Sequence, residues 1–226
     1  MMTTVGIDVG SISTKVVLGP SKGCEIVRSE GGSHTTPTAI SFSETDGGRM
    51  IGETANLKAS TTLVHLNRLV PGVLSNDKKD DDDDEEDDSF QSFYRFGISS
   101  YDTEKGVLVN IPCWNKGEAT TTTTTTYDAA AVLAMLLGKI RKNVNATLKR
   151  LASADSSAND DNDNHHTTAR RDTTVKYVLS LPPGSTKQAI QVMKDAAYAA
   201  GLGTNVQIVN SAACLATAYK RKFPEG

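Results

Sequence analysis

The chain has 226 residues, 38% of them hydrophobic, and a formal net charge of −3 at pH 7. That length can hold one large domain or two small lobes around a buried core. The nine consecutive acidic residues from Asp80 to Asp88 account for the negative balance, and the rest of the chain is mildly basic. Because no strong basic stripe is present, the composition argues against a nucleic-acid-binding protein.

Cysteine usage and apolar runs indicate the compartment. Cys24, Cys113 and Cys214 are odd in number and form no Cys-x-x-Cys pair, so we expect neither a disulfide framework nor a zinc site. The N-terminus shows no secretory signal, and the longest apolar run, Ala129 to Leu137, is far shorter than the about 20 residues that cross a bilayer. We therefore expect a cytoplasmic protein without a membrane partner. The lumen of the endoplasmic reticulum is the alternative if the N-terminus is incomplete.

The first predicted element is a β-hairpin. Two apolar runs, Val5 to Val9 and Val16 to Leu18, flank a tight Gly-Ser turn. Asp8 closes the first strand, where its carboxylate could face Mg²⁺-bound water. Gly10 allows an anion to approach the backbone, and the N–H groups of Ser11 to Ser13 can line a phosphate-sized concavity. The same residues also fit an ordinary Asp-x-Gly turn, and the hairpin alone leaves both interpretations open.

Short strands and helices are predicted after the hairpin. Strands are expected at Cys24–Ser29, Thr38–Phe42, Arg95–Ile98 and Val107–Val109, and helices at Glu53–Ser60, Leu63–Val70 and Tyr127–Leu148. In the last of these helices, apolar residues keep a spacing of three to four and Asp128 lies in the first turn, where a negative charge is favourable.

Three segments are predicted to be disordered insertions, because their compositions cannot bury enough apolar surface. They are the acidic residues 76–89, the threonine-rich residues 119–126 and the polar residues 151–172. Two functional alternatives stay open. The acidic run could bind a basic partner, and His165 and His166, close to three aspartates, could bind a metal ion.

The C-terminal part has the clearest pattern. A strand at Val175–Leu181 is followed by a helix with capping-box spacing from Ser185 to Gln188, which ends at Gly201. A strand at Val206–Val209 and a helix at Ser211–Lys222 complete the chain. A strand–helix–strand order implies parallel pairing, so the expected class is α/β, with a mixed sheet and packed helices.

Several segments, taken together and in order, resemble the nucleotide-binding domain of the heat-shock protein 70 family, which has the actin-like ATPase fold. The matching segments are Val5–Ser11, Thr35–Thr38, Ile51–Ala55, Asn67–Val70, Tyr177–Pro182, Lys194–Ala196 with Ala200–Leu202, and Asn210 with Ala213–Tyr219. They cover nearly the whole chain except the three insertions.

The resemblance implies a fold and a ligand. The fold would be lobe I of that domain, a ribonuclease-H-like subdomain (residues 1–55 and 173–226) with a small α/β subdomain (56–150) inserted. The ligands would be ATP or ADP with Mg²⁺, and the partners unfolded client proteins and co-chaperones. The implied phosphate loop consists of Asp8, Gly10, Ser11, Ile12 and Ser13, with Asp8 facing the waters of the metal.

The departures from the family pattern bear on catalysis. Ser11 and Ile12 stand where the loop usually has two threonines, Asn67 stands where the family has a lysine, and Ser211 where it commonly has a glutamate. Loss of a proton-handling or water-positioning group typically costs about 10²–10⁴-fold in rate. The family's large, atypical members also vary at these positions, and the first loop resembles theirs.

The residues and the resemblance support three functional hypotheses. The first is an ATP-binding chaperone relative with weakened or absent hydrolysis. The second is a non-catalytic interaction module, similar to an exchange factor, that keeps the fold without firm nucleotide binding. The third, a sugar kinase of the same superfold, has less support because no sugar-site motif is visible. Only lobe I motifs are matched, so the chain is expected to be a fragment or a lobe that works with a partner.

Overall fold

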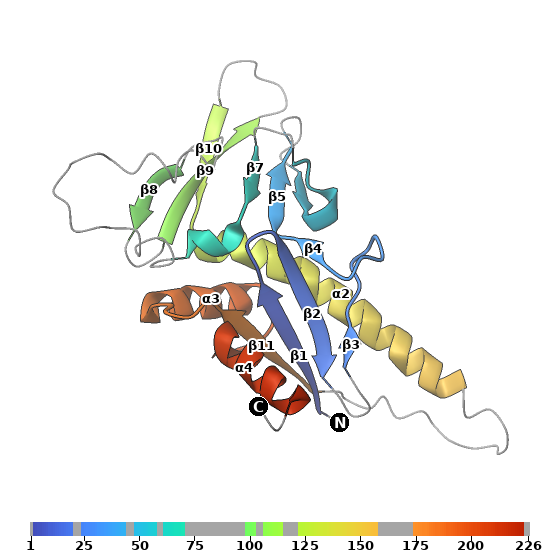
Figure 1. Ribbon diagram of the computed structural model, residues 1–226. Helices are drawn as coiled ribbons and strands as arrows, with labels where there is room; N and C mark the ends of the chain where they lie inside the picture. The colour runs from blue at the N-terminus through green and yellow to red at the C-terminus, as the bar shows by residue number, and fades with distance from the viewer. Residues whose placement is uncertain are drawn as a thin grey trace.

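The computed structural model describes residues 2–19, 24–43, 48–57, 61–70, 98–102, 106–114, 122–157 and 174–223 (Figure 1). Within these residues the chain is a mixed α/β structure with a main sheet and two three-stranded sheets. The expected class, a mixed sheet with packed helices, is confirmed.

The main sheet has the strand order β12-β11-β1-β2-β3, with β4 paired to β2. Its strands are β1 (Met2–Val9), β2 (Ser13–Gly19), β3 (Glu25–Ile26), β4 (Thr36–Pro37), β11 (Thr174–Leu181) and β12 (Gln207–Asn210). The predicted hairpin is confirmed, since β1 and β2 are antiparallel, and so is the parallel pairing of β11 with β12. In β1, Val5, Ile7 and Val9 are buried whereas Asp8 is exposed, which is the alternation of a strand with one buried face.

The two smaller sheets come from the middle of the chain. One has the order β6-β5-β7, with β5 (Ala39–Phe42), β6 (Arg49–Ile51) and β7 (Thr62–Val64), and the other joins β8 (Ile98–Asp102), β9 (Gly106–Trp114) and β10 (Thr122–Tyr127). The expected subdomain boundary at residue 55 crosses the first of these sheets, because β5 pairs with both β6 before the boundary and β7 beyond it.

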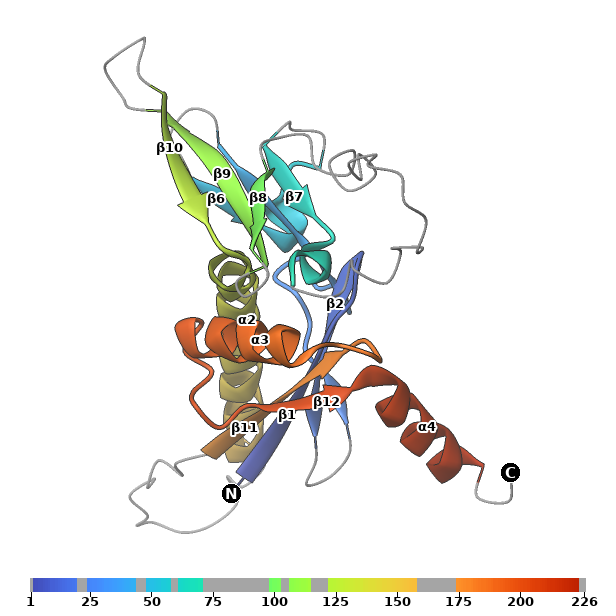
Figure 2. The same cartoon turned by 90° about the vertical axis from the view of Figure 1, so that its left-hand side faces the viewer.

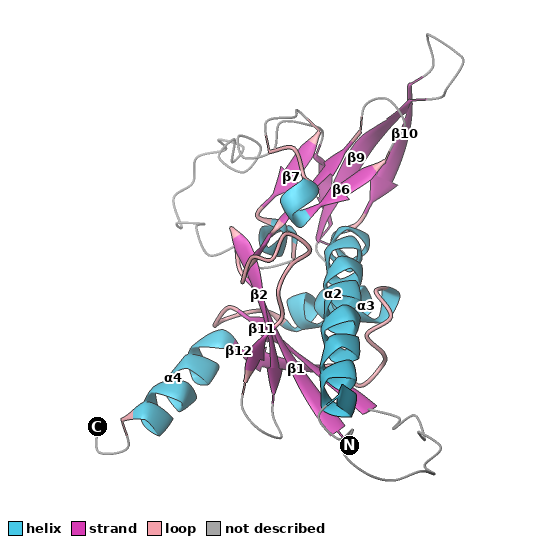
Figure 3. Ribbon diagram, turned by 90° about the vertical axis from the view of Figure 1, so that its right-hand side faces the viewer, coloured by secondary structure: helices cyan, strands magenta, loops and turns pink. Residues whose placement is uncertain are grey.

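The long helix α2 (Ala129–Ser157) connects the sheets through its buried face. Its buried side chains include Leu133, Leu136, Leu137 and Ile140. Helix α3 (Lys187–Ala199) packs across α2, as Figure 3 shows. Helix α4 (Ser211–Lys222) has no buried residue and extends away from the rest of the described chain (Figure 2). The three helices predicted in the second half of the chain are thus present.

Two predicted helices in the N-terminal half are wrong. Instead of a helix at Glu53–Ser60, a 3₁₀ turn, η1 (Gly52–Thr54), forms among the described residues. Instead of a helix at Leu63–Val70, strand β7 is followed by a 3₁₀ helix, η2 (Leu66–Leu69). The reason is that β7 pairs with β5, and this tertiary pairing overrides a weak local helix preference.

Two further expectations need correction. Five residues of the supposed threonine insertion belong to the paired strand β10, because β-branched threonine suits an extended strand. At the start of α3 the N-cap is Thr186, whose hydroxyl accepts from the Ala189 N–H at 3.1 Å, rather than Ser185 of the supposed capping box. Helix α2 also continues to Ser157, into the segment expected to be disordered.

Helix α3 ends in a Schellman motif at Gly201. The Leu202 N–H donates to the Ala197 carbonyl and the Gly201 N–H donates to Tyr198, both at 2.9 Å. Gly201 has φ of 76°, and a Cβ there would lie 2.4 Å from Nη1 of Arg141. Burial raises the pKa of the Tyr177 phenol above its ordinary value, and the positive charge of the same Arg141 guanidinium offsets part of this rise.

We expect Gly201→Ala to destabilise the chain by about 1–3 kcal/mol, because alanine is strained at this φ and must displace Arg141. Urea unfolding followed by circular dichroism measures this loss. Gly203→Ala is the matched control for backbone strain alone, since Gly203 has φ of 95° but no described atom within 4 Å of the added Cβ. An equal loss in both variants would show that the contact with Arg141 contributes nothing.

Candidate functional site

A cavity of about 220 Å³ opens at the edge of the main sheet where β1 and β11 end. Parallel strands bring their carboxyl ends to the same edge, which is where open α/β sheets bind ligands. The cavity is lined by Asp8, Val9, Gly10, Ser11, Asn67, Ser180, Leu181, Pro182 and Ser211.

The floor of this cavity is the turn between β1 and β2. Gly10 is required there by close packing, because a Cβ at this position would lie 2.7 Å from the carbonyl oxygen of Ser13. The turn therefore folds back on itself more tightly than any residue with a side chain allows.

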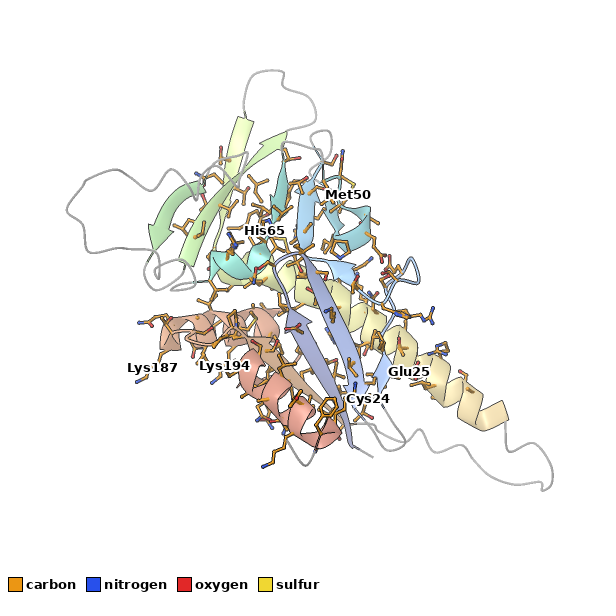
Figure 4. The ribbon with its side chains drawn as sticks, viewed as in Figure 1. Cys24, Glu25, Met50, His65, Lys187 and Lys194 are labelled. Carbon is orange, nitrogen blue, oxygen red and sulfur yellow. The ribbon has the colours of Figure 1, made fainter. Side chains whose placement is uncertain are left out.

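Neighbouring segments hold the turn through its acceptor groups. Ring nitrogen Nδ1 of His65 lies 3.0 Å from the Ser11 carbonyl oxygen and donates to it, and Figure 4 places His65 beside the hairpin tip. The side-chain amide of Asn67 donates to Ser11 Oγ at 3.1 Å, and the Thr38 N–H donates to the Ile12 carbonyl at 2.9 Å. Each of these three contacts uses an oxygen of the turn.

The backbone N–H donors of the turn, in contrast, have no acceptor within the described residues. Within the described residues, the N–H groups of Gly10, Ser11 and Ile12 donate to no backbone or side-chain acceptor. Backbone N–H groups need a hydrogen-bond partner, and successive N–H groups form anion-binding concavities. A turn whose oxygens already accept hydrogen bonds, and whose N–H groups have no acceptor, is therefore suited to an anion.

Asp8 provides the cavity with its negative charge. It pairs in register with Ser180 of β11, and Ser180 Oγ donates a hydrogen bond to Asp8 Oδ1. The hydroxyl fixes one carboxylate oxygen, while the side chain as a whole stays exposed. Oxygen ligands of this kind are the ones that Mg²⁺ prefers, usually through its water molecules. The donor set therefore fits a hydrated magnesium ion.

Asn67 is 7% exposed, and its Oδ1 atom has no hydrogen-bond partner within the described residues. Asp8 is the only ionisable side chain among the described residues that line the cavity. An anion in the cavity would thus meet no side-chain cation on its described walls. A metal ion that is bound together with the anion would supply positive charge there.

The structure brings together most of the residues that the sequence singled out. Asp8, Gly10, Ser11, Asn67 and Ser211 line the same cavity. Ile12 and Ser13 are in the turn but not on the cavity wall: Ile12 is 79% exposed, and Ser13 pairs with Pro37 of β4. Their role in binding stays a prediction.

The sequence patterns assign no role to Ser180 and His65. Ser180 reaches Asp8 only because β11 pairs with β1 in one particular register, and His65 reaches Ser11 across 54 positions of sequence. A signal for Ser180 is its position at the end of a strand, just before Leu181 and two prolines. The sequence carries no comparable signal for His65.

Other candidate sites have less support. Among the described residues, no cluster of three or more His, Cys, Asp or Glu side chains could hold a metal ion, and no helix is long and apolar enough to cross a membrane. The histidine doublet at 165–166 and the acidic run lie outside the described residues. Cys24 and Cys214 are exposed free thiols.

One comparison with known protein families gives a match. The family model described as Hsp70 protein matches residues 4–154, more than half of the chain. This range includes the β1–β2 turn, η2 with Asn67, and nearly all of α2.

Proposed function

Because the chain belongs to the Hsp70 family, we propose that it is an ATP-binding chaperone relative whose ability to hydrolyse ATP is weakened or absent. Membership of the family makes a chaperone-related ATPase the general assignment, together with the actin-like ATPase fold. Client proteins and co-chaperones are the partners of the family in general.

Binding of a nucleotide phosphate is supported mainly by the β1–β2 turn. Its carbonyls are held by neighbours and its N–H groups are open, so it can donate to phosphate oxygens without rearranging. Such preorganisation lowers the entropic cost of binding. The donors belong to the backbone and do not depend on the side chains that differ from the family pattern.

Magnesium, when bound with ATP, would offset the phosphate charge in a cavity whose described walls have no cation. Asp8 is the residue of this chain that would face its waters, and Ser180 keeps the Asp8 carboxylate in place. We therefore propose that ATP binds as its magnesium complex, and that free ATP binds much more weakly.

The proposal of weak hydrolysis is supported by the absence of charged catalytic side chains, other than Asp8, from the described walls of the cavity. Phosphoryl transfer relies on positioning and on electrostatic stabilisation of the transferred group. Asn67 and Ser211 are neutral, where the family resemblance implies a lysine and a glutamate. Asp8 is the only described lining residue whose side chain titrates, and it is also the proposed magnesium partner.

A nucleotide titration tests the proposal. We expect the unfolding temperature to rise saturably with MgATP, as RT ln(1 + [L]/Kd) requires, and no phosphate to be released above background. Mg²⁺ alone and adenosine with Mg²⁺ are the controls, because neither brings phosphate to the turn. No shift at millimolar MgATP would contradict nucleotide binding and favour the second candidate, a non-catalytic interaction module. That candidate is favoured by the lack of a cation among the described lining residues.

A double substitution tests the account of hydrolysis. Asn67→Lys with Ser211→Glu is expected to raise phosphate release only when lobe II of the family domain is supplied, because a nucleotide in this fold is held between two lobes. Single-turnover phosphate release, with and without an added lobe II, measures this. Hydrolysis gained by the double variant on its own would show that the second lobe is dispensable.

We infer that the main sheet with α3 and α4 is the ribonuclease-H-like subdomain of lobe I, and that β5 to β10 form the inserted one. The strand pairing supports a first boundary just before β5 rather than at residue 55.

A further inference from the structure

A second cavity, of about 500 Å³, lies between α2, the end of α3 and strand β6. It shares no described residue with the cavity at the β1–β2 turn. Its described lining includes four basic side chains and no acidic one: Arg49, Lys139, Arg141 and Lys142. Apolar residues, among them Ile51 and Met135, lie between these charges. We call this cavity the basic groove.

Three of the four basic side chains have no acidic partner in the part of the chain that the structure describes. Lys139 is paired with Glu30, but Arg49, Arg141 and Lys142 form no ion pair within the described residues. Arg141 is nevertheless held in place, because its Nη1 donates to the Ala200 carbonyl at 3.4 Å at the end of α3. An anchored guanidinium still has further N–H donors, and these suit a carboxylate.

Gly138 makes room at the centre of the groove. It lies in the interior of a 29-residue helix, where glycine is among the least favourable residues. No described heavy atom outside the helix backbone lies within 4 Å of the Cβ that alanine would add, and its φ is not positive, so neither crowding nor backbone conformation requires glycine. What glycine does provide is open space between Met135 and Lys142, its neighbours on the same helical face.

We propose that the basic groove binds an acidic, amphipathic peptide segment of a partner protein. The apolar side of the segment lies on Ile51, Met135 and the open surface at Gly138, and its carboxylates pair with Arg49, Arg141 and Lys142. Charge complementarity identifies the partner as acidic, and the apolar floor favours a peptide over a nucleic acid. The groove is separate from the nucleotide cavity, so this interaction does not depend on the proposed function.

Fluorescence anisotropy with the full chain tests the proposal. The probe is a fluorescein-labelled helical peptide of about 14 residues, roughly four turns, with leucines on one face and glutamates on the other. We expect saturable binding that weakens as salt is raised from about 0.05 M to about 0.3 M, since the charges at the groove are open to solvent. A peptide with lysines in place of the glutamates should not bind.

Matched variants locate the site. Lys142→Glu and Arg49→Glu should each weaken peptide binding about tenfold, whereas Lys149→Glu, the same charge reversal on the same helix but outside the groove, should leave it unchanged. Gly138→Leu should fill the floor and abolish binding. Its unfolding temperature should not fall, because leucine is a better helix former than glycine, so loss of binding is separated from loss of folding.

Three results would overturn the proposal. One is an equal loss of affinity in Lys142→Glu and Lys149→Glu, which would mean unspecific attraction between charges. Another is displacement of the peptide by polyuridylate at similar concentrations, which would assign the groove to nucleic acid. The third is peptide binding that is seen only after residues 76–89 are deleted, which would assign the groove to the chain's own acidic run.

Discussion

Replacing Gly10 with alanine is expected to weaken MgATP binding by at least about tenfold, or about 1.4 kcal/mol. The added methyl group would lie 2.7 Å from the Ser13 carbonyl oxygen, a distance that real Cβ atoms do not adopt. The turn has to shift, and its N–H groups move with it. Because the proposed binding of phosphate depends on the directions of these N–H groups, we expect Gly10→Ala to reduce the affinity for MgATP more than it reduces the folding stability.

Gly6→Ala is the matched control for this prediction. It makes the same substitution in the preceding strand, but its Cβ would lie an ordinary 3.9 Å from the Val17 carbonyl oxygen. We expect its affinity for MgATP to equal that of the unaltered chain. Isothermal titration calorimetry measures both. If Gly10→Ala binds MgATP as tightly as Gly6→Ala does, the turn is not the phosphate site.

Replacing Leu136 with alanine is expected to cost about 2–5 kcal/mol of folding free energy. Leu136 is fully buried on the face of α2 that joins the sheets, and truncation removes apolar contacts and leaves a cavity behind. A loss of this size is a large share of the stability of a typical domain. Urea unfolding monitored by circular dichroism gives the free energy directly.

Leu215→Ala in α4 is the control for Leu136→Ala. The Leu215 side chain is 72% exposed, so its truncation should change stability by less than about 0.5 kcal/mol. A large loss in Leu215→Ala would mean that α4 packs against other parts of the chain. A negligible loss in Leu136→Ala would show that α2 is not the centre of the core.

Local patterns set what the sequence can predict. The β1–β2 hairpin and strand β11 have strong alternating or β-branched patterns. Helices α2, α3 and α4 have apolar periodicity or clear ends, such as Gly201 after α3 and Asn210 before α4, whose Oδ1 accepts from two N–H groups of the first turn. These elements are predictable because the information that fixes them lies within a few residues.

Other features depend on pairing between distant segments. Strands β7 and β10 form because β5 and β9 provide pairing partners. The local sequences of β7 and β10, both of which contain threonine, do not reveal these partners. For the candidate site, Asp8 and Gly10 can be identified from the turn. The contacts of Ser180 with Asp8 and of His65 with Ser11 depend on the register of the sheet and on the position of η2, which no local pattern determines.

We propose above all that the backbone N–H groups of the β1–β2 turn hold the phosphates of a nucleotide. Amide hydrogen exchange of residues 10–12, with MgATP and with Mg²⁺ alone, tests it most directly. We expect exchange at these residues to slow at saturating MgATP, while exchange in the exposed helix α4 does not change. Unchanged exchange at residues 10–12 under conditions where MgATP raises the unfolding temperature would contradict the claim, because the nucleotide would then bind elsewhere.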